Sequence, residues 1–383
     1  MNGLINMERT KQNLQVFMLV LVCFLVSACN RVADKKAGAN RHVTLDVRNR
    51  IISSPDSALL LQSYYLSCPY LEEKDGAFIA YNYRENALDI IHDTAFVDRI
   101  KLEQHGKNGI AGRITSMLPI NKDSIFLFDQ VAFYLIDSKG KVLHRHREKN
   151  FVFLDCNYAM HTAMMGWDGN DILFYPVDDN GKYKILHYSM KKEKVIKETE
   201  LDFPTCNSDG TKCYCDMNYP NITFNGSKII YNYSYDSDIR TIDVRTGERK
   251  TYSCEVSSAP KHLEAYKDNG KFEDWLEYDW ANVHFYEVSY LSKARLYARL
   301  MLGGVNMKEY KDRGTIVDAR SLYLTLLDEN FNVVSHQQLQ DKRYNHFHGW
   351  CMLPGSIAIF VDNLLGKNPE VIDYDEIIPV DKK

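Results

Sequence analysis

The sequence lacks a surplus of charge of either sign, although about a quarter of its residues are charged. Its 383 residues include 47 Lys and Arg against 51 Asp and Glu, a formal net charge of −4. A protein that binds nucleic acid needs a surplus of basic side chains to neutralise phosphates, so no nucleic-acid partner is expected. Because 45% of the residues are hydrophobic, the composition also excludes a disordered or collagen-like chain.

Familiar catalytic and metal-binding motifs are also missing from the sequence. It contains no Gly-x-Ser-x-Gly elbow, no His-Glu-x-x-His and no EF-hand loop. The glycine-rich residues 106–109 lack the spacing of a phosphate-binding loop, and a turn rather than a helix is expected after them. We therefore predict no cofactor and no metal, and we favour a binding or scaffold role over an enzyme.

No hydrophobic run is long enough to cross a bilayer, which takes about 20 residues. Residues 16–26 form an apolar run of 11, preceded by Arg9 and Lys11, as in a secretory signal. The run ends in Val-Ser-Ala-Cys, which resembles the lipobox of bacterial lipoproteins. This resemblance implies cleavage before Cys29 and lipid on its thiol, a firm membrane anchor. The alternative is an ordinary secretory signal in which this cysteine occurs by chance.

The rest of the chain divides into a short tether and a folded domain. We predict a signal peptide over residues 1–28, a polar tether over 29–41 and one folded domain over 42–383. Residue 30 is Asn, at a position where Asp would suggest retention in the inner membrane of many Gram-negative bacteria. The expected location is therefore the cell envelope, as an outer-membrane lipoprotein facing the periplasm or the surface.

Cysteine usage fits an exported protein without proving disulfides. After removal of Cys23 and lipidation of Cys29, seven of the nine cysteines remain, an odd number that leaves at least one thiol unpaired. Cys206, Cys213 and Cys215 lie within ten residues of one another in a polar loop. We favour a small loop-closing disulfide between two of these three, with free thiols as the alternative. A metal site is least favoured because Cys-x-Cys is not the usual zinc spacing.

Strand-forming residues are abundant, with 25 Tyr and 17 Phe in the chain. The body consists of many short strand-like runs separated by turn signals, and few stretches have a helical period, which indicates an all-β protein. A strong hairpin signal is Asn180-Gly181 between the runs at 171–175 and 183–188.

These runs group in fours along the chain. Five complete sets occupy residues 60–103, 112–146, 157–203, 221–254 and 284–339, and three further runs lie within 349–374. One set is too small to bury its own faces, but sets stacked around an axis bury them against each other. We predict a six-bladed β-propeller of four-stranded antiparallel blades, closed by the N-terminal strand at 42–47. A seven-bladed ring and a two-sheet sandwich are the alternatives.

Two segments are longer than a blade requires. One is the cysteine-bearing loop at about 204–220, and the other, at 256–283, is expected to hold a short helix with Trp275 and Trp280. We favour a packed flap for the second segment, with an aromatic binding lip as the alternative.

Several segments resemble parts of the six-bladed β-propeller lipoproteins of Bacteroidetes, which are of the TolB-like or NHL-like type. They are the lipobox, residues 104–110, residues 123–126, Tyr278-Asp279 and residues 326–331. Lys107 is a departure, since the family often carries proline there. The resemblance covers nearly the whole mature chain and implies a propeller fold and an envelope location. It implies no activity and no catalytic residue.

The ligand site of a propeller is commonly found where the loops before the innermost strands meet around the axis. The candidate ligand-binding residues expected there are Tyr64, Tyr65, Arg113, His161, Asn221, His346 and His348. The leading hypothesis is a lipid-anchored binding or scaffold protein for a glycan, a peptide or a partner protein. The alternatives are a saccharide hydrolase or lyase that uses His161, His346 and His348, and an assembly role with outer-membrane partners.

Overall fold

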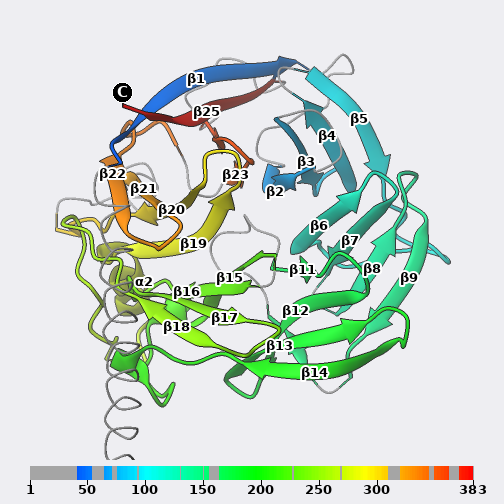
Figure 1. Ribbon diagram of the computed structural model, residues 1–383, viewed down its shortest axis with the longest axis horizontal. Coiled ribbons are helices and arrows are strands. Elements are labelled where there is room, and N and C mark those ends of the chain that lie inside the picture. Colours follow the sequence, from blue (N-terminus) through cyan, green and yellow to red (C-terminus); the bar gives the residue numbers. More distant parts are fainter. Residues whose placement is uncertain are drawn as a thin grey trace, which may run out of the picture.

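The strands of this protein radiate in blades from a central axis (Figure 1). The computed structural model describes residues 41–53, 64–70, 76–92, 95–129, 131–149, 151–154, 164–226, 228–267, 270–308, 320–344, 349–361 and 371–382. The predicted signal peptide and tether up to residue 40, including Cys29, lie outside the described residues, as do His161, His346 and His348.

Six blades follow one another around the ring, in chain order. Blade 1 contains β2 (Tyr64–Pro69), β3 (Ala77–Asn82), β4 (Ala87–His92) and β5 (Ala95–Lys101). Blade 2 contains β6 (Ser116–Asn121), β7 (Ser124–Phe128), β8 (Ala132–Ile136) and β9 (Val142–Arg147). Blade 3 contains β10 (Val152–Phe153), β11 (Gly166–Trp167), β12 (Ile172–Asp179), β13 (Lys182–Ser189) and β14 (Lys194–Glu200).

The second half of the ring repeats the same antiparallel pattern. Blade 4 contains β15 (Pro220–Asn225), β16 (Lys228–Tyr233), β17 (Ile239–Asp243) and β18 (Arg249–Tyr252). Blade 5 contains β19 (His284–Leu291), β20 (Leu296–Leu302), β21 (Leu322–Leu327) and β22 (Val333–Gln338). Blade 6 contains β23 (Trp350–Met352), β24 (Ile357–Phe360) and β25 (Val371–Asp381), with β1 (Val43–Ser53) as its outer strand. The predicted six-bladed propeller is confirmed.

The N-terminal strand closes the ring by pairing with the C-terminal strand. β1 runs antiparallel to β25, and each of its 11 residues, from Val43 opposite Asp381 to Ser53 opposite Val371, has a partner there. A single parallel bridge between Ser53 and Ala95 then links this blade to blade 1. The sequence predicted the closing strand but made both partners shorter than they are.

Hydrophobic side chains fill the spaces between blades. The described residues form six buried clusters, one between each pair of neighbouring blades, and the cluster between blades 3 and 4 also reaches Phe285 and Met301 of blade 5. Because a cluster lies on each side of a blade, middle strands such as β3 and β20 are buried on both faces. The outer strand β9 instead alternates half-buried with exposed residues, since only one of its faces meets a neighbouring blade.

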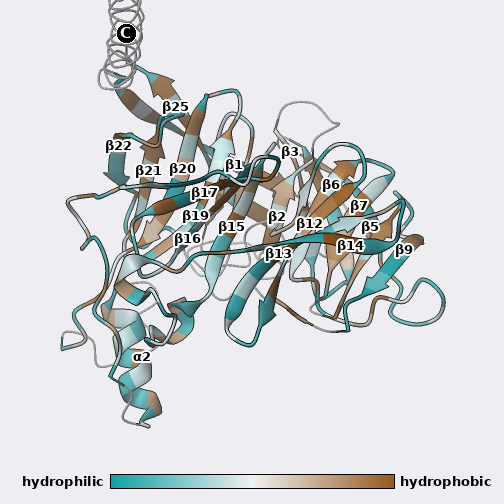
Figure 2. Ribbon diagram, turned by 60° about the horizontal axis from the view of Figure 1, so that its bottom comes forward, coloured by the Kyte–Doolittle hydropathy of each residue, from teal (hydrophilic) through white to brown (hydrophobic). Residues whose placement is uncertain are grey.

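Two insertions stand on the face of the ring where the innermost strands begin, here called the amino face. The first contains the 3₁₀ helices η3 (Thr205–Asn207) and η4 (Cys215–Asn218) and leads into β15. The second contains α2 (Phe272–Ala281) and leads into β19, and Figure 2 shows α2 standing off the blades, away from β25. The predicted short helix is confirmed. No helix among the described residues is long and apolar enough to cross a membrane.

Candidate functional site

A cavity of about 590 Å³ lies on the axis of the propeller. Its wall comes from the carboxyl ends of the innermost strands of all six blades, β2, β6, β11, β15, β19 and β23. Hairpin-turn residues Gly169, Gly226 and Ser292 also line it, so it opens on the face opposite the insertions, here called the carboxyl face. The volume lies within the range of about 300–1,000 Å³ that is usual for small-molecule sites.

Three aromatic side chains from neighbouring blades form one side of this axial cavity. Trp167 ends β11, Phe224 lies near the end of β15, and Tyr290 lies near the end of β19. All three are half-buried, and each is supported by another ring. The ring centroids of Trp167 and Phe126 are 5.7 Å apart, those of Phe224 and Phe174 are also 5.7 Å apart, and those of Tyr290 and Tyr297 are 4.9 Å apart. The aromatic wall is therefore preorganised.

Tyr290 is further fixed by polar contacts at the rim of the cavity. Its hydroxyl donates a hydrogen bond to Oε1 of Glu329 at 2.9 Å, and Arg295 Nη2 contacts Oε2 of the same carboxylate at 2.5 Å. Burial, followed by this hydrogen bond, raises the pKa of Tyr290 above its ordinary value. These contacts hold the ring of Tyr290 in a fixed position.

The polar groups of the axial cavity are uncharged. The hydroxyls of Ser289 and Ser292 have no hydrogen-bond partner among the described residues. Asn225 donates through Nδ2 to the Tyr297 hydroxyl at 2.9 Å, which leaves its carbonyl oxygen able to accept from a ligand. No Asp, Glu, His, Lys or Arg side chain lines the cavity in the part of the chain that the structure describes. The wall thus suits a neutral molecule that carries both apolar faces and hydrogen-bonding groups.

A buried carboxyl group lies just beneath the cavity. Trp350 precedes the lining residue Met352 by two positions and therefore shares its strand face, and Glu287 precedes the lining residue Ser289 by two positions. Trp350 donates from Nε1 to Oε1 of Glu287 at 2.7 Å. Burial raises the pKa of Glu287 to about 7, although the indole hydrogen bond acts in the opposite direction.

Those predicted ligand-binding residues that the structure describes belong to the amino face, opposite the opening of the axial cavity. Tyr64 and Tyr65 begin β2, and Arg113 precedes β6, so all three belong to the amino face. Asn221, near the start of β15, donates to the Ser234 hydroxyl and to the backbone oxygen of Phe285. Neither Arg113 nor Asn221 is among the described residues that line the axial cavity. Their role in ligand binding remains a prediction.

The two tryptophans of the second insertion also lie away from the cavity. Trp275 is half-buried and its ring stacks on exposed Phe272 with centroids 5.8 Å apart. Half-buried Trp280 accepts a backbone hydrogen bond from Val305. The helix is held to its insertion by Tyr278, whose hydroxyl donates to the backbone oxygen of Glu264 at 2.6 Å. These contacts are those of a packed flap with one exposed aromatic ring at its end.

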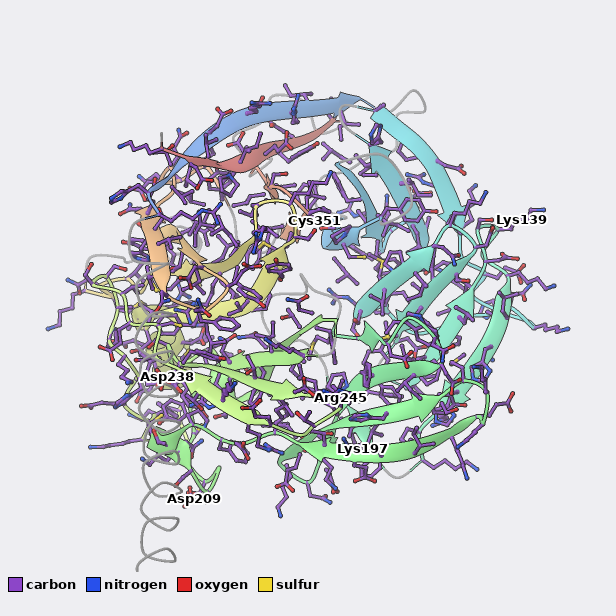
Figure 3. The ribbon with its side chains drawn as sticks, in the orientation of Figure 1. Lys139, Lys197, Asp209, Asp238, Arg245 and Cys351 are labelled. Atoms are coloured by element: carbon purple, nitrogen blue, oxygen red, sulfur yellow. The ribbon has the colours of Figure 1, made fainter. Side chains whose placement is uncertain are left out.

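The cysteines of the first insertion are free thiols. Cys206 and Cys213 are half-buried and Cys215 is buried, and no disulfide joins them. The loop-closing disulfide favoured from the sequence is therefore not formed in this structure. Asp209, labelled in Figure 3, marks the tip of this insertion, at the periphery of the ring and away from Cys351 on the innermost strand of blade 6. Among the described residues no group of three or more His, Cys, Asp or Glu is placed to hold a metal ion.

One glycine allows the aromatic wall to form. A β-carbon on Gly166 would clash with the ring of Phe224, so β11 and β15 approach closely only because this side chain is missing. We expect Gly166→Ala to displace Phe224, to destabilise the protein by about 1–3 kcal/mol and to narrow the cavity. Urea unfolding measures the loss of stability. Gly169→Ala is not a matched control because Gly169 has φ of 85°. Gly355→Ala is one, since a β-carbon there would meet only side-chain atoms of Lys293 at 3.6 Å or more, and it should leave the stability nearly unchanged.

A six-bladed β-propeller with an axial, ligand-sized cavity is thus the class of protein that the fold and the site define. The chain belongs to the DUF4221 family, described as a domain of unknown function, whose model matches residues 42–337. This confirms the resemblance to a Bacteroidetes propeller family. No curated protein matches the chain.

Two solved structures from Bacteroides share the fold. A DUF4221 member from Bacteroides vulgatus is 10% identical, with a TM-score of 0.69 over 89% of this chain and 99% of that one. A protein of Bacteroides fragilis suggested to be exported is 12% identical, with a TM-score of 0.51 over 88% of this chain and 96% of that one. At these identities the likeness concerns the fold alone.

Proposed function

We propose that this protein is an envelope-located binding protein that holds an uncharged, saccharide-like ligand in its axial cavity. The observation that carries the proposal is the composition of the wall, with three supported aromatic rings, two hydroxyls without partners and no charged side chain among its described residues. A scaffold that only stacked its blades would bury such rings rather than leave them beside an open volume of about 590 Å³.

The chemistry of the wall favours a sugar over other neutral ligands. A pyranose ring has apolar faces formed by its C–H groups, and these pack on flat aromatic rings such as Trp167. Its hydroxyls both donate and accept hydrogen bonds, as do Ser289 and Ser292, and they can donate to the amide oxygen of Asn225. Ionised carboxylates and phosphates would find no cationic partner among the described lining residues.

The envelope location is supported by the N-terminal sequence and by the exported character suggested for the similar Bacteroides fragilis protein. The described chain begins on the carboxyl face, because Arg41 donates to the backbone oxygens of Ala294 and Arg295 in the β19–β20 hairpin. Arg41 also forms an ion pair of 2.6 Å with Asp381. The residues between Cys29 and Arg41 reach at most about 40 Å when extended. In a lipid-anchored protein the cavity would therefore open on the face of the ring from which the tether extends.

Trp167→Ala tests the proposed site directly. We expect it to weaken binding of a neutral glycan by about 2 kcal/mol, roughly 30-fold in Kd, because a central aromatic contact is lost. The measurement is a glycan array probed with the full chain in detergent, followed by calorimetry with any glycan that binds. Trp275→Ala is the matched control, since Trp275 lies on the amino face, and it should leave Kd unchanged.

Three results would contradict the proposal or redirect it. An array without any bound glycan would favour a peptide or protein partner. Binding that Trp275→Ala reduces and Trp167→Ala does not would move the site to the amino face. Release of new reducing ends or unsaturated sugars from a bound glycan would support the hydrolase or lyase alternative instead.

A further inference from the structure

A second cavity lies on the carboxyl face, farther from the axis, and is here called the outer pocket. Its volume is about 480 Å³, and its lining comes from the β19–β20 turn, the β21–β22 turn, the end of β25 and Arg41 before β1. Because β19, β21 and β25 run in the same direction within their antiparallel blades, both turns and the end of β25 lie on the face where the axial cavity opens. The volume is large enough for a small-molecule group of its own.

The outer pocket and the axial cavity adjoin at the β19–β20 turn. Ser292 lines the axial cavity, and the next residue, Lys293, lines the outer pocket. Tyr290 makes a second connection, since its ring belongs to the axial wall and its hydroxyl donates at 2.9 Å to Glu329, which lines the outer pocket. Ser292 and Lys293 are both exposed. A chain-like ligand can therefore lie over this turn and enter both volumes.

The charges of the outer pocket balance one another. Three cationic side chains and three carboxylates line it: Arg41, Lys293, Arg295, Asp328, Glu329 and Asp381. Arg41 contacts Asp381 at 2.6 Å, and Arg295 contacts Glu329 at 2.5 Å. An ionised group on a ligand would gain little net attraction here. A hydroxyl group gains more, because it can donate to a carboxylate and accept from a guanidinium.

Hydrogen-bonding groups remain open in the outer pocket. The backbone N–H of Asn330 donates to Asp328 at 2.9 Å, and its side-chain amide has no partner among the described residues. The Arg295 side chain is 71% exposed, and its contacts with Glu329 use Nε and Nη2. Since a guanidinium carries five N–H donors, donors remain for a ligand. The amide both donates and accepts, and the guanidinium donates, as neighbouring hydroxyl groups of a sugar require.

We propose that the outer pocket is a second sugar subsite and that the ligand is a neutral oligosaccharide whose chain passes over the β19–β20 turn. This inference rests on the function proposed for the axial cavity. One sugar unit packs on the aromatic wall, and a later unit of the same chain hydrogen-bonds with Asn330 and Arg295. Because the two units are linked, binding of the second is intramolecular, and the chain binds more tightly than either unit alone.

Calorimetry with sugars of increasing length tests the proposal. The full chain in detergent is titrated with the cello-, malto- and manno-oligosaccharide series, each from a single hexose upward. For a series that binds, we expect Kd to fall by about tenfold once the chain is long enough to reach the outer pocket, and to fall no further beyond that length. Asn330→Ala should raise Kd of the longer sugars by about fivefold and leave that of the single hexose within about twofold.

Lys139→Ala is the matched control for Asn330→Ala. The two residues occupy the same place in their turns, since the backbone N–H of Lys139 donates to Asp137 at 2.9 Å as that of Asn330 does to Asp328. Lys139 lies on the opposite side of the ring (Figure 3). Its replacement should leave every Kd unchanged. Trp167→Ala should weaken short and long sugars by the same factor, because both occupy the axial cavity.

The outcomes separate this inference from the proposed function. Equal Kd values at every length, or a gain with length that Asn330→Ala leaves intact, would overturn the outer subsite while the axial site stands. Absence of binding at every length would contradict the axial site itself, and the inference with it. Tighter binding of a uronic acid oligomer than of a neutral one of equal length would overturn the assignment of a neutral ligand.

Discussion

Replacing Asp375 by alanine is expected to lower the free energy of unfolding by about 3 kcal/mol. Asp375 lies in β25, is 1% exposed and accepts three strong hydrogen bonds. Arg343 donates from Nε at 2.5 Å and from Nη2 at 2.7 Å, and the Tyr344 hydroxyl donates at 2.6 Å. The substitution leaves a partly buried guanidinium and a buried hydroxyl without their acceptor, and breaking a buried ion pair in this way usually costs about 3–5 kcal/mol.

Because Asp375 lies where the two ends of the chain close the ring, its substitution is expected to weaken that closure. It lies opposite Asn49 of β1, which donates to it at 3.1 Å. The carboxylate thus joins the closing strand, the C-terminal strand and the segment before β23. Since blade 6 is the only blade assembled from both chain ends in the described structure, it has no covalent hairpin to hold its outer strand.

Urea unfolding of the wild type and of the Asp375→Ala variant measures the difference in free energy of unfolding. Asp381→Ala is the matched control. Asp381 lies in the same strand and pairs with Arg41, but its side chain is 60% exposed. An exposed ion pair of this kind contributes less than about 1 kcal/mol. Equal losses from the two substitutions would show that the Asp375 contacts do not stabilise the closure.

Most of the propeller could be predicted because its units are local. Each hairpin has its own turn signal, and Asn180 and Gly181 do adopt the positive φ values of 55° and 83° that such a turn needs. The closing strand was also predictable, since the last set of runs lacked one strand and residues 42–47 supplied a spare one. Its full length was not, because the later residues of β1, such as exposed Ile51, do not alternate cleanly.

The innermost strand of blade 3 shows where local patterns fail. Two short strands, β10 and β11, pair with β12 at separate places, through Val152 opposite Asp178 and Gly166 opposite Phe174. A strand of two residues has no period, so neither could be recognised from the sequence. Trp167, the largest ring of the cavity wall, belongs to one of them.

The cavity could not be predicted for a related reason. Trp167, Phe224 and Tyr290 look like any core residue in a strand, and only the packing of six blades shows at which end of the axis a volume remains. The sequence argument placed the ligand where the innermost strands begin, as is common in propellers, whereas the axial cavity lies where they end. An aromatic residue near the end of three successive innermost strands was the signal available.

The carboxyl group of Glu287 is expected to destabilise the folded protein as the pH rises from about 4.5 to about 7. Its pKa is about 7 in the folded state against an ordinary value of 4.5, because it is fully buried and its hydrogen bond from Trp350 compensates only in part. Below pH 4.5 the group is protonated in both states, and no penalty exists. Between these values the unfolded chain ionises first, and above pH 7 the penalty is constant at about 3 kcal/mol.

Glu287→Gln removes this titration while it keeps an oxygen that accepts from the indole of Trp350. The free energy of unfolding of the wild type should fall by about 3 kcal/mol relative to that of the variant between pH 4.5 and pH 8. Tryptophan emission should titrate near pH 7 in the wild type alone, since ionisation places a charge 2.7 Å from the Trp350 indole nitrogen. Glu248→Gln, at a side chain that is 61% exposed, should retain the wild-type dependence of the unfolding free energy on pH. If the Glu287→Gln variant also retained this dependence, burial would not hold the Glu287 carboxyl group protonated.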